Sequence, residues 1–184
     1  NRCLPIILTG FLALVSLLAK AQNKPGIELG VKKAQGEIKL DGVLDEPDWQ
    51  AAQVAGNFYL NYPVDTIPAD YQSEVKVTFD QHSLYYGIVC FDDNKPDIVQ
   101  SLRRDIVFEL NDNIGIYVDP FNDFTNGFFF TVTPMGVQSE GIISNGGATD
   151  DSYLDSWDNK WYSKVTRHAD RWVAEVAIPF KTIR

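Results

Sequence analysis

Histidine and cysteine are scarce in this sequence, which narrows the chemistry that it can carry. The chain has two of each among its 184 residues. His82 and His168 lie in predicted turns, and neither type of residue shows the spacing of a zinc or haem site. A Gly-x-Ser-x-Gly nucleophile motif and a phosphate-binding loop are also absent. These absences remove the support for the enzyme classes that depend on such sites.

Basic residues are also few. Lys and Arg number 16 against 25 Asp and Glu, which gives a formal net charge of -9 at pH 7. Binding to nucleic acid or to an anionic membrane needs concentrated positive charge. The composition therefore argues against both partners. It is compatible with a secreted protein that faces small solutes, and equally with simple solubility.

Only the N-terminus has a long apolar run. Arg2 precedes the apolar stretch Leu4–Leu18, and Ala19-Lys20-Ala21 follows with the small-x-small pattern of a cleavage site. Residues 1–21 are therefore predicted to be a signal peptide, with an uncleaved anchor as the alternative. We expect the protein to be exported, to the periplasm, outer membrane or cell surface. The polar residues 22–35 are predicted to form a linker.

The clearest structural signals lie between residues 113 and 143. Apolar residues alternate with others in Asn113–Asp119 and in Gly127–Thr133, and a short polar turn joins the two segments. A second turn at Thr133–Gly136 leads into Val137–Ile143. Three consecutive antiparallel strands are the favoured interpretation, because the connections are too short for crossover helices.

Similar signals occur along the rest of the chain, with one helical turn at Asp45–Ala52, where Asp45 is the predicted N-cap. Further strands are expected at Gly36–Gly42, Phe58–Leu60, Ser73–Asp80, Leu84–Phe91, Ile98–Arg104, Trp157–Arg167 and Arg171–Ile178. Cys90 falls in one of these apolar strands and is expected to be a buried thiol. About nine short strands with little helix predict an all-β fold, an antiparallel β-sandwich of jelly-roll type spanning residues 36–184.

Several short motifs, in this order and spacing, resemble the family 9 carbohydrate-binding module. They are Leu40-Asp41-Gly42, Asp45-Glu46 with Trp49, Glu74–Val77, Leu84–Tyr86, Asp119, Asn126–Phe128, Pro134–Gly136, Trp157 to Trp161, and Trp172–Phe180. The chain is most similar to versions in exported Bacteroidetes-type proteins, in which the module precedes a C-terminal domain of unknown function. In those proteins at least one more strand follows, so the resemblance implies that this domain is truncated before its closing strand.

The resemblance implies binding of a polysaccharide or oligosaccharide. Sugar rings pack on aromatic faces, and their hydroxyls need several polar partners. Trp49 and Trp172 are expected to be core residues. Trp157, Trp161 and Tyr153, which border an Asp-rich loop, are the candidate ligand contacts. Arg104 is a further candidate, with a surface ion pair as the alternative role.

The resemblance also implies a structural calcium ion, and acidic loops supply the oxygen ligands that calcium prefers. Asp119, Asn122 and Asp123 are the candidate ligands, with solvated turn residues as the alternative.

Non-catalytic carbohydrate binding in polysaccharide breakdown is the leading hypothesis. The alternative is a structural or docking domain for a downstream membrane-associated or hydrolase domain. If the intact protein is a glycoside hydrolase, we expect its catalytic residues to lie beyond Arg184. A glycosidase needs a pair of placed carboxylates, and nothing in the sequence marks the strand glutamates Glu140 and Glu175 as buried.

Overall fold

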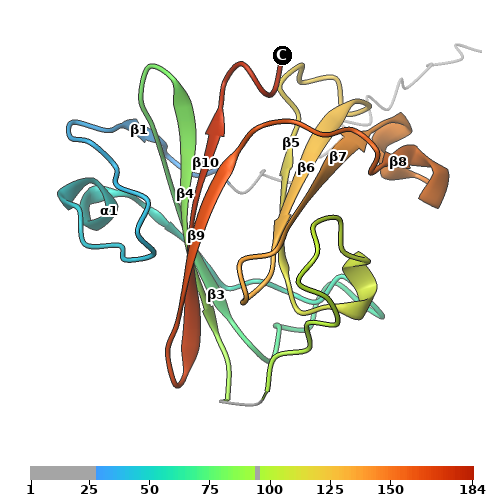
Figure 1. The fold of residues 1–184 in the computed structure, drawn as a ribbon, viewed down its shortest axis with the longest axis horizontal. Coiled ribbons are helices and arrows are strands. Elements are labelled where there is room, and N and C mark those ends of the chain that lie inside the picture. Colours follow the sequence, from blue (N-terminus) through green and yellow to red (C-terminus); the bar gives the residue numbers. More distant parts are fainter. Residues whose placement is uncertain (1–27, 94–95) are drawn as a thin grey trace, which may run out of the picture.

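The structure is a computed structural model that describes residues 28–93 and 96–184. Two β-sheets pack face to face, so the predicted β-sandwich is confirmed at this level (Figure 1). The predicted signal peptide and most of the predicted linker lie outside the described residues. Within the described residues, no helix has the length and apolar character needed to cross a membrane.

One sheet has six strands. Its main path runs β1-β3-β4-β10-β9, and β2 also pairs with β3. All neighbours are antiparallel except β1 and β3. The bounds are β1 Lys32–Lys33, β2 Val54–Ala55, β3 Ser73–Phe79, β4 Ser83–Phe91, β9 Tyr162–Arg167 and β10 Arg171–Pro179. Helix α1, Pro47–Ala51, lies on the outer side of this sheet (Figure 1).

The other sheet has four antiparallel strands in the order β5-β6-β7-β8. Their bounds are β5 Ile114–Val118, β6 Gly127–Val132, β7 Gln138–Ile143 and β8 Tyr153–Leu154. Short 3-10 turns flank it at η1 Phe108–Leu110, η2 Asn145–Gly147 and η3 Asp150–Ser152. The first three strands are the predicted meander, which is confirmed.

The core lies between the two sheets, where the period-two pattern directs the apolar side chains. Phe128, Phe130 and Val132 of β6 face the buried residues Trp172, Ala174, Val176 and Ile178 of β10. Trp172 is thus a core residue, as predicted. Ile88 and Cys90 of β4 belong to the same cluster, and burial raises the pKa of the Cys90 thiol to about 11. The thiol is therefore protonated and unreactive at neutral pH.

Two predicted strands are absent, Gly36–Gly42 and Ile98–Arg104. In both segments carboxylate and amide side chains, not a neighbouring strand, accept the backbone N–H groups. Glu46 accepts the bond from Lys39 N at 3.0 Å, and Asp112 accepts that from Ile98 N at 2.7 Å. Strand pairing occurs instead at β1, which lies inside the segment predicted as a linker.

Smaller differences concern element ends. Phe58–Leu60 forms only an isolated bridge between Tyr59 and Pro68. The strand predicted to begin at Trp157 begins at Tyr162. Glu46, and not Asp45, occupies the N-cap of α1.

Glu175 is the most buried acidic residue of the six-stranded sheet, with 0% exposure. Its Oε2 accepts hydrogen bonds from the backbone N–H groups of Asp41 at 2.9 Å and Gly42 at 2.7 Å. Its Oε1 accepts the indole N–H of the fully buried Trp49 at 3.0 Å. Burial raises the pKa of Glu175, although these bonds oppose the shift. The carboxylate thus fastens both the N-terminal segment and α1 to the sheet.

We predict that Glu175→Ala lowers the free energy of unfolding by about 3 kcal/mol, because three N–H groups lose their acceptor inside the protein. Urea unfolding measures the change. Glu74→Ala, at an exposed glutamate of β3, is the matched control and should cost under about 0.5 kcal/mol. Equal losses in the two variants would contradict this role for Glu175.

Asp80 holds the tight turn between β3 and β4. Its Oδ1 accepts the N–H groups of His82 at 2.6 Å and Ser83 at 2.8 Å, and its Oδ2 accepts the Tyr85 hydroxyl at 3.0 Å. Burial acts to raise the pKa of Asp80, but these hydrogen bonds outweigh it and hold the pKa below its usual value.

A lowered pKa means that the ionised carboxylate stabilises the native state above the unfolded-state pKa, and that this contribution disappears as the pH falls through the native pKa. We expect Asp80→Asn to cost about 1 kcal/mol at neutral pH and less at about pH 2, well below the unfolded-state pKa of about 4. Urea unfolding of both proteins at the two pH values provides the test. A cost that does not change with pH would show that the charge is unimportant.

Candidate functional site

The main concavity lies on the outer face of the four-stranded sheet. We refer to it as the aromatic cleft. Its volume is about 580 Å³, within the range of small-molecule sites. Strands β5–β7 form its floor, and the segments around η1 and η3 form its walls. The lining residues are Asp105, Ile106, Val107, Phe108, Glu109, Tyr117, Phe129, Thr131, Ser139, Gly147, Ala148, Thr149, Asp150, Tyr153 and Asp155.

The alternation of side chains along β5 and β6 directs two aromatic rings into the cleft. Ile116 and Phe130 point into the core, so Tyr117 and Phe129 point outward. Glycine makes room for these rings. A Cβ at Gly141 would lie 2.5 Å from Cε1 of Phe129, and one at Gly115 would lie 3.0 Å from Cε2 of Tyr117. The absence of these two side chains therefore lets the rings lie against the sheet.

Tyr153 completes the aromatic set. Its ring meets that of Phe129 edge to face, with centroids 6.1 Å apart. Burial raises the pKa of the Tyr117 hydroxyl, and the nearby Tyr153 and Glu109 add to the shift. Tyr117 and Tyr153 are 54% and 43% exposed, so their rings are accessible to a ligand.

Polar atoms on the floor of the cleft complement these rings. Thr131 and Ser139 lie on adjacent strands in direct register, with exposures of 1% and 5%. Among the described residues, the Thr131 Oγ1 atom has no hydrogen-bond partner. A buried hydroxyl without a partner is unusual in native proteins, and an ordered water, an ion or another bound molecule commonly accounts for one.

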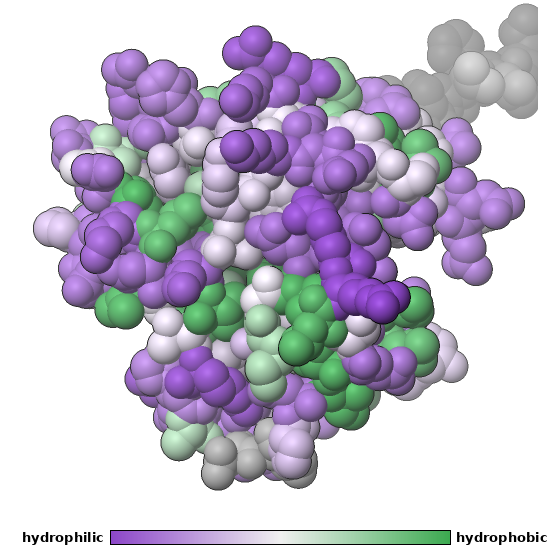
Figure 2. All heavy atoms as spheres, viewed as in Figure 1, coloured by the Kyte–Doolittle hydropathy of each residue, from purple (hydrophilic) through white to green (hydrophobic). Residues whose placement is uncertain are grey.

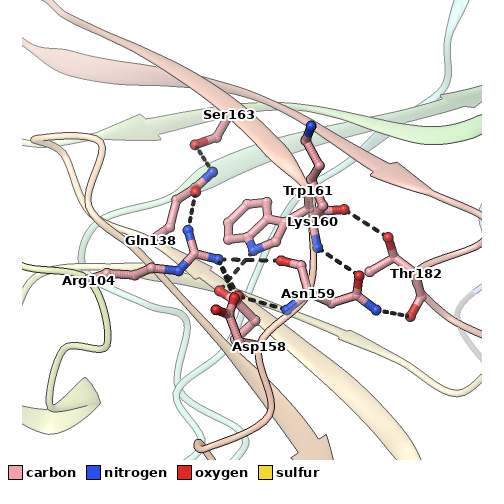
Figure 3. Close-up of polar contacts among 9 residues, drawn as sticks. Arg104, Gln138, Asp158, Asn159, Lys160, Trp161, Ser163 and Thr182 are labelled. Carbon is pink, nitrogen blue, oxygen red and sulfur yellow. Dashed lines mark hydrogen bonds and ion pairs between the residues drawn. The ribbon is translucent and has the colours of Figure 1, made fainter.

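Arg104 and Trp161 line a separate, shallower depression of about 510 Å³ with Asp158, Asn159 and Lys160 (Figure 3). Arg104 Nη2 forms an ion pair with Glu140, which is 1% exposed, and Nη1 donates to Gln138 Oε1 at 2.8 Å. The Trp161 indole N–H donates to Glu140 Oε2 at 2.9 Å. The guanidinium is thus directed to the protein itself, as in the ion-pair alternative.

The two candidate tryptophans belong to the core and not to the aromatic cleft. Trp161 is 4% exposed, and its ring centroid lies 5.4 Å from that of Phe130. Trp157 is partly buried and packs on Phe128, with ring centroids 5.0 Å apart. The sequence interpretation placed them near a loop but did not show that their rings pack against Phe128 and Phe130. Of the predicted ligand residues, only Tyr153 lines the aromatic cleft.

Sequence reasoning missed Tyr117, Phe129, Thr131 and Ser139. Two signals were present. Tyr117 and Phe129 occupy the outward positions of strands in which the alternation predicts one buried face. Glycines inside strands, such as Gly115 and Gly141, commonly mark places where something approaches the sheet closely.

The predicted calcium ligands lie in the turn after β5. Asp119 accepts N–H bonds from Phe121 at 3.0 Å and Phe124 at 2.9 Å. Asp123 accepts bonds from Asn126 and Thr125, which hold its pKa far below the usual value. Within residues 28–93 and 96–184, no group of three or more His, Cys, Asp or Glu side chains is placed to hold a metal ion. The geometry shows turn-stabilising carboxylates, and calcium stays a prediction.

Solved structures share this architecture. A family 9 carbohydrate-binding module from Caldicellulosiruptor kristjanssonii in complex with cellotriose matches with a TM-score of 0.54 and 15% identity, over 81% of this chain and 66% of that chain. A structure of such a module from the same organism with glucose gives a TM-score of 0.57 and 13% identity, over 83% and 70%. This chain has the fold of a family 9 carbohydrate-binding module. No protein-family model and no curated protein matches it.

The similarity confirms the predicted resemblance at the level of fold. This chain spans about two thirds of the length of each matched chain, 66% and 70%. At 13% to 15% identity the match carries the arrangement of the strands and not the identity of individual site residues.

We predict that Trp161→Phe lowers the free energy of unfolding by about 2 kcal/mol, because the buried Glu140 loses an N–H donor. Trp157→Phe, which keeps a ring against Phe128, is the matched control and should cost less. Thermal and urea unfolding measure both variants. An unchanged stability of Trp161→Phe would contradict a structural role and return Trp161 to the candidate ligand contacts.

Proposed function

We propose that this domain is a non-catalytic carbohydrate-binding module and that the aromatic cleft holds the sugar. The observation that carries the proposal is the combination of accessible rings, Tyr117 and Tyr153, with a polar floor that contains the unpartnered Thr131 hydroxyl. The fold supports it, since modules of the same architecture are described in complex with cellotriose and glucose.

The chemistry of a sugar matches this arrangement. A pyranose ring presents C–H groups on its faces, which pack on aromatic rings, and hydroxyls at its edge, which donate and accept hydrogen bonds. In the cleft, Tyr117 and Tyr153 offer the rings, while Thr131 and Ser139 offer hydroxyls on the floor. A bound hydroxyl would satisfy Thr131 Oγ1.

The acidic residues of the cleft are compatible with a site that binds a sugar without catalysis. Asp105, Glu109, Asp150 and Asp155 are all exposed. A glycosidase needs a carboxylic acid that its surroundings keep protonated near neutral pH, usually by burial. The exposure of these four side chains differs from the buried setting in which the acid of a glycosidase usually lies.

We further propose that the module acts outside the cytoplasm, in polysaccharide breakdown. The support is the N-terminal pattern of Arg2, an apolar run and Ala19-Lys20-Ala21, which is typical of a signal peptide.

Docking of a further domain is the second candidate function. The segment between β4 and β6 exposes large apolar side chains, including Leu102 at 78% and Phe124 at 83%. Figure 2 shows apolar side chains gathered below the middle of one face of the molecule. Such patches are common at interfaces between domains.

Calorimetric titration with glucose, cellotriose and soluble xylan and cellulose fragments tests the main proposal, with calcium and with chelator. We expect Tyr117→Ala and Tyr153→Ala each to weaken binding by about tenfold, because each removes a ring against which the sugar packs. Tyr62→Ala is the matched control, since Tyr62 is 85% exposed and does not line the cleft.

A folded sample that binds none of these sugars would overturn carbohydrate binding and favour the docking role. Binding that survives both cleft variants would keep the function but move the site elsewhere.

A further inference from the structure

The aromatic cleft carries an unbalanced negative charge. Four carboxylates line it, Asp105 and Glu109 on one wall and Asp150 and Asp155 on the other, and no Lys or Arg is among the lining residues. In the part of the chain that the structure describes, none of these four has an ion-pair partner. The cleft therefore presents acceptors and negative charge to whatever enters it.

The nearest basic residue in the sequence is directed away from the cleft. Arg104 adjoins Asp105 in the chain, yet its guanidinium binds Gln138, Glu140 and Asp158 (Figure 3). Arg104 is thus committed to a separate depression and does not neutralise Asp105.

We infer that the aromatic cleft prefers a cationic amino sugar, such as a glucosamine unit, to a neutral sugar, and rejects a uronic acid. The inference rests on the proposed function and names the substrate class of the same site. A protonated amine on a sugar ring presents three donors and no acceptor, which suits carboxylates and the free Thr131 Oγ1. A uronate carries only acceptors at its charged group and meets the four carboxylates with like charge.

Thr131 indicates a ligand independently of the acidic residues. It is 1% exposed, lies on strand β6 among the lining residues of the cleft, and has a hydroxyl oxygen without a partner in the described structure. A native protein rarely leaves such an atom unsatisfied. The carboxylates then favour a ligand that carries a positive charge.

The size of the preference follows from screened electrostatics. The carboxylates are exposed, so each acts through water, and salt at about 0.15 M screens charges beyond about 8 Å. We expect about tenfold tighter binding of the amino sugar than of the neutral sugar at low salt, and little difference near 0.5 M salt.

The experiment is calorimetric titration of the full chain with four trimers: cellotriose, the glucosamine trimer, the N-acetylglucosamine trimer and a galacturonic acid trimer. The buffer is mildly acidic, so that the amines of the glucosamine trimer are protonated while the carboxyl groups of the galacturonic acid trimer are ionised. Low and high salt are compared. The N-acetylated trimer is neutral and separates the effect of charge from that of a substituent at the same carbon.

A matched pair of double variants completes the test. Glu109→Gln with Asp155→Asn removes two charges from the cleft and keeps its rings. Asp65→Asn with Glu74→Gln removes two exposed charges elsewhere, so this double variant has the same net charge as the first one. The first variant should lower the ratio of glucosamine to cellotriose affinity by at least about threefold, while the second should leave it unchanged.

The outcomes separate the two levels of the proposal. Equal affinity for all four trimers overturns the charge preference and leaves carbohydrate binding intact. A preference for the glucosamine trimer that changes neither with salt nor in the cleft variant has the same consequence. No binding of any trimer to a folded sample overturns both. Tighter binding of the galacturonic acid trimer than of the glucosamine trimer overturns the charge preference outright.

Discussion

Two buried glutamates, one on each sheet, hold tryptophan side chains, and much of the structure depends on these contacts. Glu175 of β10 accepts the indole N–H of Trp49, and Glu140 of β7 accepts that of Trp161. A buried carboxylate is costly unless several donors surround it. Both glutamates therefore collect further donors from distant segments: Asp41 and Gly42 at Glu175, and Arg104 at Glu140. Each glutamate thus fixes irregular chain to a regular sheet.

The position of the aromatic cleft follows from this arrangement. The ion pair of Arg104 with Glu140 fixes the chain immediately before Asp105, where one wall of the cleft begins. The floor depends on the opposite face of the strands that build the core. Phe130 packs inward against Trp161 while Phe129, its neighbour, packs outward against Tyr153. Because side chains alternate along β6, one face of the strand contributes to the core and the other face contributes to the candidate binding surface.

The regular part of the fold could be predicted from the sequence because its signals are local. Alternation in Ser73–Phe79 and Arg171–Pro179, and the turns near Asp80 and Asp170, require only neighbouring residues. The irregular part could not be predicted in this way. Gly36–Gly42 alternates like a strand, but its N–H groups reach Glu175, which lies 133 residues from Gly42. The same limit applies to Trp161, because its acceptor is 21 residues away.

The ion pair of Arg104 with Glu140 also links the stability of the fold to the electrostatics of the cleft. The guanidinium that compensates the buried carboxylate is unavailable as a counter-ion for Asp105, its neighbour in the chain. A substitution that removed the negative charge of Glu140 would leave Arg104 without its buried counter-ion, with Gln138 and Asp158 as its remaining partners. One core position thereby influences the charge at the border of the cleft, so a change in the interior of the domain can alter the electrostatics of its surface.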